Sequence, residues 1–173
     1  MYDKTKAVRV MMDHGLVNCR QIFNAAQIAG MPLPFACAQM EKETGGANIY
    51  GRSDGPRATL SGFPDPVNED NFRAFWHMVK VQGFQSNGVG PCQITSAGLI
   101  QEMLNQDFLP WDPESNMTFG MRKLKGYHDG AVRDKEQHPW VVAGRVYNGS
   151  TAYGEDLVAK AHNWATLLEG AKL

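Results

Sequence analysis

The chain has few cysteines and almost no net charge, and both features limit the classes of function that it could have. Its three cysteines, Cys19, Cys37 and Cys92, form no C-x-x-C pair and cannot supply a disulfide framework. Synthesis in a reducing compartment is therefore expected. The formal net charge is −1 over 173 residues. Because proteins that bind nucleic acid or anionic membranes are usually clearly basic, neither partner is expected.

Long apolar runs and clustered metal ligands are also missing. No stretch approaches the length of a membrane-spanning helix, and the N-terminal segment lacks the apolar core of a signal peptide. The five histidines show no H-x-x-x-H spacing and no cysteine–histidine cluster. No metal or other cofactor is therefore expected. These absences predict a protein that is made in the cytoplasm and does not insert into a membrane. We expect it to be a monomer.

What is present is the composition of one soluble domain, with 43% apolar and 20% charged residues and no internal repeat. Apolar residues recur at helical spacing and strand patterns are weak, so the predicted fold class is mostly α. Glycines and prolines break any period between residues 48 and 67, where at most a small hairpin at 58–63 is expected. The expected helices cover residues 4–13, 19–29, 34–43, 96–106, 140–147 and 155–168, with one between Asn68 and Gly83 and one beginning at Asp112-Pro113.

Four short motifs follow one another at wide spacing. The helix expected at 34–43 ends in Glu43 and is followed by the sequence TGG. Residues 88–94 read GVGPCQI, a glycine-framed loop that suits close approach of the backbone to a ligand. Residues 112–120 read DPESNMTFG, a helix start, and residues 143–149 read AGRVYNG. Each motif is weak by itself, but their order is informative.

In this order, across residues 35–164, the motifs resemble those of the lytic transglycosylase and goose-type lysozyme superfamily. Similar E-x-T-G-G, N-G-V-G-P and Q-I-T stretches occur in lysins of phages that infect actinobacteria. The resemblance implies a single lysozyme-like, two-lobed helical domain over 1–173, with an irregular insert at about 48–82 after the catalytic helix. It implies cleavage of the MurNAc-β-1,4-GlcNAc bond in peptidoglycan glycan strands. As an endolysin, the protein would be made in the host cytoplasm and act on the wall after release.

The resemblance assigns Glu43 as the general acid and Tyr147 as the residue whose hydroxyl orients it. A carboxyl at a helix end beside buried surface holds its proton tightly, as glycosidases require near neutral pH. Glu41 lies about 200° away around the helix and cannot share one cleft wall with Glu43. The alternative for Tyr147 is a core tyrosine, and both glutamates could instead be ordinary solvated residues.

The resemblance also implies substrate contacts by Gln93, Gly90, Thr95 and Asn148. The alternative for Gln93 is a loop glutamine that caps backbone groups. Thr95 stands where goose-type lysozymes carry an aspartate that helps to hold the attacking water. Its presence favours the transglycosylase route, in which the 6-hydroxyl of the muramic acid completes the reaction and one glutamate suffices.

Hydrolysis is the alternative route, and it needs a second carboxylate. Asp54 and Asp65 in the insert are the candidates. Asp54 is preferred and is included among the catalytic residues, because it lies 11 residues after Glu43 in a turn that could fold over the cleft. An Asp-Gly pair in a loop is otherwise ordinary turn chemistry.

Two more distant functions remain open. Cys92 could act as the nucleophile of a cell-wall peptidase with His128 or His138, but nothing places it at a helix start, where the dipole would lower its pKa. The chain could also be an inactive peptidoglycan-binding module. The joint presence of Glu43, Gln93 and Tyr147 argues against that, because binding alone needs no acid.

Overall fold

The computed structural model describes residues 1–51 and 63–173 and confirms the mostly α class in that part of the chain. No strand occurs there, and two isolated bridges, Tyr2 to Lys172 and Tyr50 to Val89, are its only β pairings. The helices are α1 (Lys4–Asp13), α2 (Cys19–Ala29), α3 (Leu33–Glu43), α4 (Glu69–Lys80), α5 (Ala97–Asn105), α6 (Pro113–Arg133), α7 (Pro139–Asn148) and α8 (Thr151–Leu167), followed by the 3-10 turn η1 (Glu169–Ala171).

Local capping explains most of these boundaries. The Asn68 side chain accepts a hydrogen bond from the Asn71 N–H at 3.0 Å, and the Asn71 side chain accepts one from the Asn68 N–H. Helix α4 therefore begins with a capping box. Asp112 caps α6 by accepting from the Ser115 N–H at 2.7 Å, with a proline at the first helical position. Gly30 ends α2 in the left-handed region, with φ 64°.

Several helix ends differ from the sequence prediction, most of them by one residue. Helix α3 begins one residue earlier, at Leu33, and α4 ends at Lys80, before the expected stop at Gly83. Helix α8 begins at Thr151 rather than residue 155, because a single residue, Ser150, suffices as its N-cap after α7 ends at Gly149 with φ 88°. The hairpin expected at 58–63 falls almost wholly outside the described residues.

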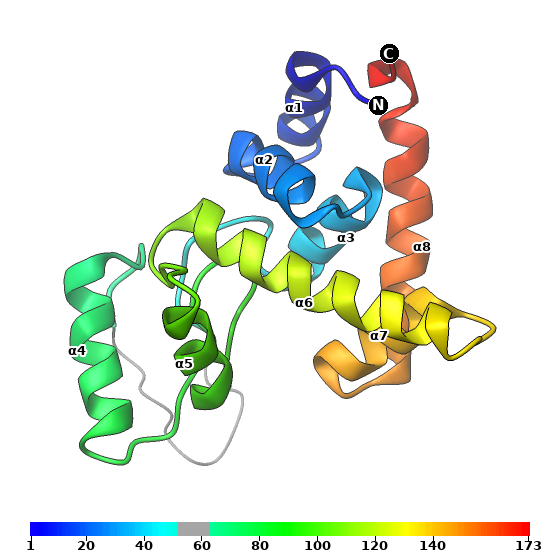
Figure 1. Ribbon diagram of the computed structural model, residues 1–173. Coiled ribbons are helices and arrows are strands. Elements are labelled where there is room, and N and C mark those ends of the chain that lie inside the picture. Colours follow the sequence, from blue (N-terminus) through cyan, green and yellow to red (C-terminus); the bar gives the residue numbers. More distant parts are fainter. Residues whose placement is uncertain (52–62) are drawn as a thin grey trace.

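The long helix α6 runs through the middle of the molecule (Figure 1). Helices α1, α2, α3 and α8 lie on one side of it, and α4 and α5 lie on the other. Helix α6 packs against α2 and α7, while α8 packs against α3 and α7. Helix α3 is thereby held against α8, which follows it much later in the sequence.

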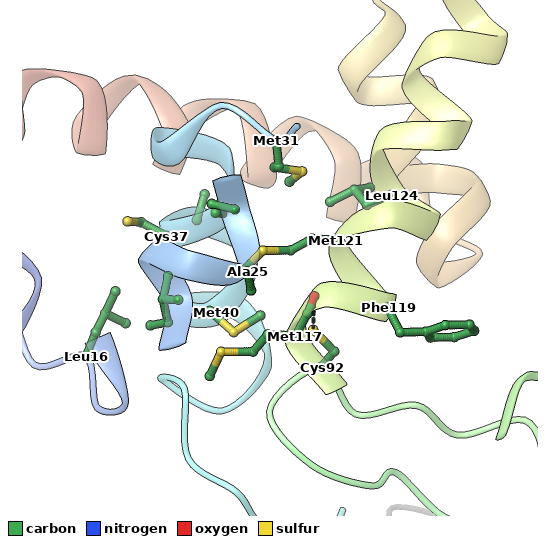
Figure 2. Close-up of a cluster of buried hydrophobic side chains, with 14 of the residues drawn as sticks. Leu16, Ala25, Met31, Cys37, Met40, Cys92, Met117, Phe119, Met121 and Leu124 are labelled. Carbon is green, nitrogen blue, oxygen red and sulfur yellow. Dashed lines mark hydrogen bonds between the residues drawn. The ribbon is translucent and has the colours of Figure 1, made fainter. Parts of the chain in front are cut away.

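The core between α2, α3 and α6 is rich in sulfur (Figure 2). Met40 of α3 and Met117 and Met121 of α6 are fully buried, as is Cys37. Methionine side chains adapt to irregular gaps, which suits helices that meet at unequal spacing. An aromatic part of the same core anchors α4, where the Phe75 ring centroid lies 5.3 Å from that of Tyr50 and 5.6 Å from that of Phe63.

Helices α7 and α8 approach one another closely through two glycines. A Cβ atom added at Gly154 would lie 2.2 Å from the Val141 carbonyl oxygen. One added at Gly144 would lie 2.5 Å from the Gly154 Cα atom. These backbone contacts leave no room for a side chain, so the α7–α8 angle depends on both glycines.

Substitution of Gly154 by alanine is therefore expected to destabilise the protein by about 1–3 kcal/mol, because the added methyl group overlaps backbone. Gly126→Ala is the matched control, since Gly126 is an exposed helical residue of α6 with nothing within 4 Å of an added Cβ. It should stabilise by about 0.5–1 kcal/mol through helix propensity. Thermal melting measures both; an unchanged or higher melting temperature in Gly154→Ala would contradict the packing.

Candidate active site

Glu43 is the last residue of α3, and the chain turns sharply after it. Gly46 has φ 87°, and a Cβ atom there would lie 2.4 Å from the Val17 carbonyl oxygen. The Thr44 hydroxyl lies 2.9 Å from the Ala47 carbonyl oxygen and 3.1 Å from that of Pro91, and donates to these acceptors. Thr44 thus ties the end of the helix to the glycine loop.

The glycine loop is held from the other side by Asn116 of α6. This side chain is fully buried; its Oδ1 accepts from the Cys92 N–H at 2.9 Å, and its Nδ2 donates to the Val89 carbonyl at 3.0 Å. Gly90 lies against it with φ 71°, and a Cβ atom there would lie 2.6 Å from the Asn116 Nδ2. The D-P-x-x-N motif therefore has a physical role: its asparagine fixes the loop.

Gln93 supports the loop from within. Its Nε2 donates to the carbonyls of Gly90 at 2.9 Å and Ile49 at 3.1 Å, and its backbone adopts φ 48°. Cβ atoms at Gly88 and Gly51 would lie 2.4 Å and 2.7 Å from its Oε1. These contacts fit the alternative in which Gln93 caps backbone groups. The residue also lines the cavity beside Glu43.

A cavity of about 390 Å³ opens beside Glu43. Four other residues expected at the site from the sequence, Gln93, Thr95, Tyr147 and Asn148, line it with Glu43. Gly90 shapes the loop and is not among the lining residues. The remaining wall comes from α5, α6 and the residues before α5, namely Ile94, Ser96, Leu99, Phe119, Lys123 and Tyr127.

Glu43 is the one carboxylate among the described residues that line this cavity. Asp54 lies outside the described residues. Asp65 lies elsewhere: its carboxylate accepts from the Tyr50 N–H at 2.9 Å, and it lines a different cavity, of about 780 Å³, together with Trp111. Asp65 is therefore not placed beside Glu43.

The hydroxyl partner of Glu43 is Tyr153, which donates to its Oε1 at 2.6 Å. The expected contact from Tyr147 is wrong: its hydroxyl donates to the Cys92 carbonyl at 3.0 Å. The two rings lie side by side, with centroids 6.3 Å apart and an interplanar angle of 29°. The sequence prediction began α8 at residue 155, which left Tyr153 in a connecting loop and hid its approach to α3.

Burial raises the pKa of Glu43, while the Tyr153 hydrogen bond and the positive charge of Lys42 lower it by less. Burial also raises the pKa of Tyr147 and of Tyr153. Both phenols consequently remain protonated donors across the neutral range, and Glu43 holds its proton to higher pH than an exposed glutamate. That is the property required of a general acid.

Glu41 faces a different environment, as helical geometry requires. Its Oε1 accepts from the Lys160 amine at 2.6 Å and its Oε2 from the Trp164 indole N–H at 2.8 Å. Both partners lie on α8. Glu41 thus fastens α3 to α8, whereas Glu43 points to the cavity.

Cys92 lacks the environment of a nucleophile. It is 1% exposed, and burial holds the pKa of its thiol well above the usual range. Its Sγ donates to the Met117 carbonyl, and a Cβ atom at Gly120 would lie 2.5 Å from it. Reactive cysteines need an accessible thiolate, so the peptidase hypothesis has no support here.

No group of three or more His, Cys, Asp or Glu side chains suited to a metal ion occurs among residues 1–51 and 63–173. Within the same ranges, no helix is both long and apolar enough to cross a membrane. No protein-family model, curated protein or solved structure matches the chain. The function must therefore be inferred from the site itself.

Removal of the Tyr153 hydroxyl tests the geometry around Glu43. In Tyr153→Phe the hydrogen bond that lowers the pKa of Glu43 is lost, so the pKa of this carboxyl should rise. Carbon-detected NMR titration of the glutamate side chains measures the midpoint. Tyr147→Phe is the matched control, because the Tyr147 hydroxyl donates to the Cys92 carbonyl and not to Glu43. In this variant the titration midpoint of Glu43 should stay near that of the wild type. A larger change in Tyr147→Phe than in Tyr153→Phe would reverse the two assignments.

Proposed function

We propose that this protein cleaves peptidoglycan glycan strands at the MurNAc-β-1,4-GlcNAc bond, with Glu43 as the general acid. The observation that carries the proposal is a carboxyl with a raised pKa at a helix end, facing a cavity that Gln93, Thr95, Tyr147 and Asn148 also line. A protonated carboxyl can donate to the glycosidic oxygen as the sugar becomes oxocarbenium-like. A binding module needs no such acid.

Tyr153 gives the carboxyl a defined orientation. Its hydroxyl donates to Oε1 of Glu43, and no described group hydrogen-bonds to Oε2. Oε2 is therefore the oxygen that can carry the transferable proton. Since the donor must lie within hydrogen-bond reach of the leaving oxygen, a fixed carboxyl favours proton transfer. Tyr147 holds the Cys92 carbonyl and thereby steadies the loop that carries Gln93 and Thr95.

The proposed route is that of a lytic transglycosylase. Glu43 is the one lining carboxylate in the described part of the chain, and the Thr95 hydroxyl donates to the Gln93 carbonyl at 2.9 Å rather than presenting a base. A single acid suffices when the 6-hydroxyl of the muramic acid attacks its own anomeric carbon and closes the 1,6-anhydro ring. The alternative is a hydrolytic muramidase that uses Asp54 as its second carboxylate.

The proposal extends to a two-lobed, lysozyme-like domain, with α5 on one side of the cavity, α3 and α7 on the other, and α6 between them. It also includes the role suggested by the sequence motifs: a monomeric phage endolysin, made in the host cytoplasm, that reaches the wall after release. Peptidoglycan glycan strands are its proposed partner.

Glu43→Gln is expected to reduce the clearing of purified cell walls by at least about 100-fold, because it removes only the transferable proton. Glu41→Gln is the matched control on the same helix. It breaks contacts to Lys160 and Trp164 and should keep most of the activity. If Glu43→Gln cleared walls at near the wild-type rate, the assignment of Glu43 as the general acid would be wrong. Loss of clearing only in Glu41→Gln would assign that role to Glu41.

The melting temperature provides the folding control for Glu43→Gln, and its sign follows from linkage. Because the folded-state pKa of Glu43 is raised, the stability tied to its protonated form is present at low pH and declines as pH rises through that pKa. Glutamine stays neutral and escapes this decline. Glu43→Gln should therefore melt at or above the wild-type temperature at neutral pH, with the difference vanishing in acid.

Mass spectrometry of the released muropeptides separates the two routes. The transglycosylase route yields products that end in 1,6-anhydro-muramic acid, one water lighter than the hydrolytic products and without a reducing end. Products with reducible ends, together with a large loss of rate in Asp54→Asn, would instead establish a hydrolase with Asp54 as the second carboxylate.

A further inference from the structure

Tyr153 lies between an acid and a cation. Its hydroxyl donates to Glu43 Oε1 at 2.6 Å, and the Lys42 amine lies 4.3 Å from the centroid of its ring. A cation at this distance is attracted to the ring face. Its positive charge also stabilises negative charge on the phenol oxygen, which strengthens the phenol as a donor. The charge of Lys42 thus reaches Glu43 both directly and through Tyr153.

The Lys42 amine is held by the carboxylate of Asp156 in an ion pair. Asp156 lies three residues after Tyr153 on α8, so both side chains project from one helix face towards the end of α3. The two partners differ in exposure: the Lys42 side chain is 12% exposed and that of Asp156 is 49% exposed. The cation therefore lies on the side of the acid, and the anion that neutralises it faces water.

The ionisable groups on the other elements around Glu43 are either uncharged or paired with a group of opposite charge. Burial raises the pKa of Tyr147 on α7 and of the Cys92 thiol in the glycine loop, so both stay uncharged near neutral pH. Lys123 of α6 lines the same cavity, but its amine binds both carboxylate oxygens of Glu102, at 2.9 and 3.0 Å. Lys42 is consequently the cation that lowers the pKa of Glu43, and Asp156 is its partner, with Lys160 also near Asp156 on α8.

We propose that the Lys42–Asp156 ion pair tunes Glu43 through Tyr153 and so sets the pH range in which the site works. Lys42 and Asp156 are positioning residues, since neither lines the cavity. Lys42 acts on Glu43 both directly and through Tyr153, and Asp156 acts through Lys42. The consequence for glycan cleavage rests on the proposed function. The consequence for the proton on Glu43 does not.

The two partners have opposite effects in this proposal, and that gives the test. Lys42→Met removes the cation, so the NMR titration midpoint of Glu43 should move to higher pH. Asp156→Asn exposes Glu43 to an uncompensated Lys42, so the midpoint should move to lower pH, and the double variant should fall between the single variants. At a fixed pH on the alkaline side of the pH–rate profile, the rate should rise roughly two- to fourfold in Lys42→Met and fall similarly in Asp156→Asn.

Lys125→Met is the matched control, because Lys125 of α6 also pairs with a carboxylate, that of Asp129, and does not line the cavity. It should leave the Glu43 midpoint unchanged. Partly exposed ion pairs add little stability, so all variants should melt near the wild-type temperature. Midpoints that move in the same direction in both single variants, or not at all, would overturn the proposal, because a merely structural pair is damaged alike by the loss of either partner.

The NMR titration needs no substrate, which separates this inference from the proposed function. Opposite midpoint shifts in a protein that cleaves no glycan would support the tuning pair and refute the glycosidase. Wall cleavage with midpoints equal to that of the wild type would refute the tuning pair and leave the glycosidase intact.

Discussion

The buried side chain of Asn116 is the contact on which the site depends. It satisfies the Cys92 N–H, which otherwise would lie buried without a partner as the glycine loop crosses α6, and it is a second donor to the Val89 carbonyl, which also accepts from the Ile94 N–H. Once the loop is fixed, the Pro91 carbonyl can accept from Thr44, and the end of α3 is set relative to α6. Glu43 therefore owes its place to hydrogen bonds made by residues that never touch the cavity.

The immediate surroundings of Glu43 balance two opposing effects. Burial disfavours its charged form, and the hydrogen bond from Tyr153 favours it. One turn earlier on α3, the fully buried Gln39 side chain lies beside the Tyr147 hydroxyl. It lowers the pKa of that phenol, but by less than burial raises it.

The sequence predicted the helices well because their ends are local. Asn68 and Asp112 cap their own helices, and no distant contact is needed to place them. It also brought Glu43 together with four of its cavity neighbours, since each motif carries a separate part of one wall. It assigned Tyr147 to the acid and did not consider Tyr153, six residues later. Tyr147 and Tyr153 sit on different helices, and only the crossing of α7 and α8 at Gly144 and Gly154 determines which hydroxyl meets the acid.

Helices hold both Glu43 and its hydroxyl partner, and this suits the proposed reaction, which relies on one acid. Glu43 ends α3, and Tyr153 lies on α8, which packs against α3 and, backbone against backbone, against α7. In the proposed reaction, a carboxyl held in this way would not have to reorganise while charge develops on the sugar, which is the main source of electrostatic catalysis. Where the substrate supplies its own nucleophile, the protein needs only to hold and aim one proton. A helix end, a buried loop and one tyrosine hydroxyl are sufficient for that task.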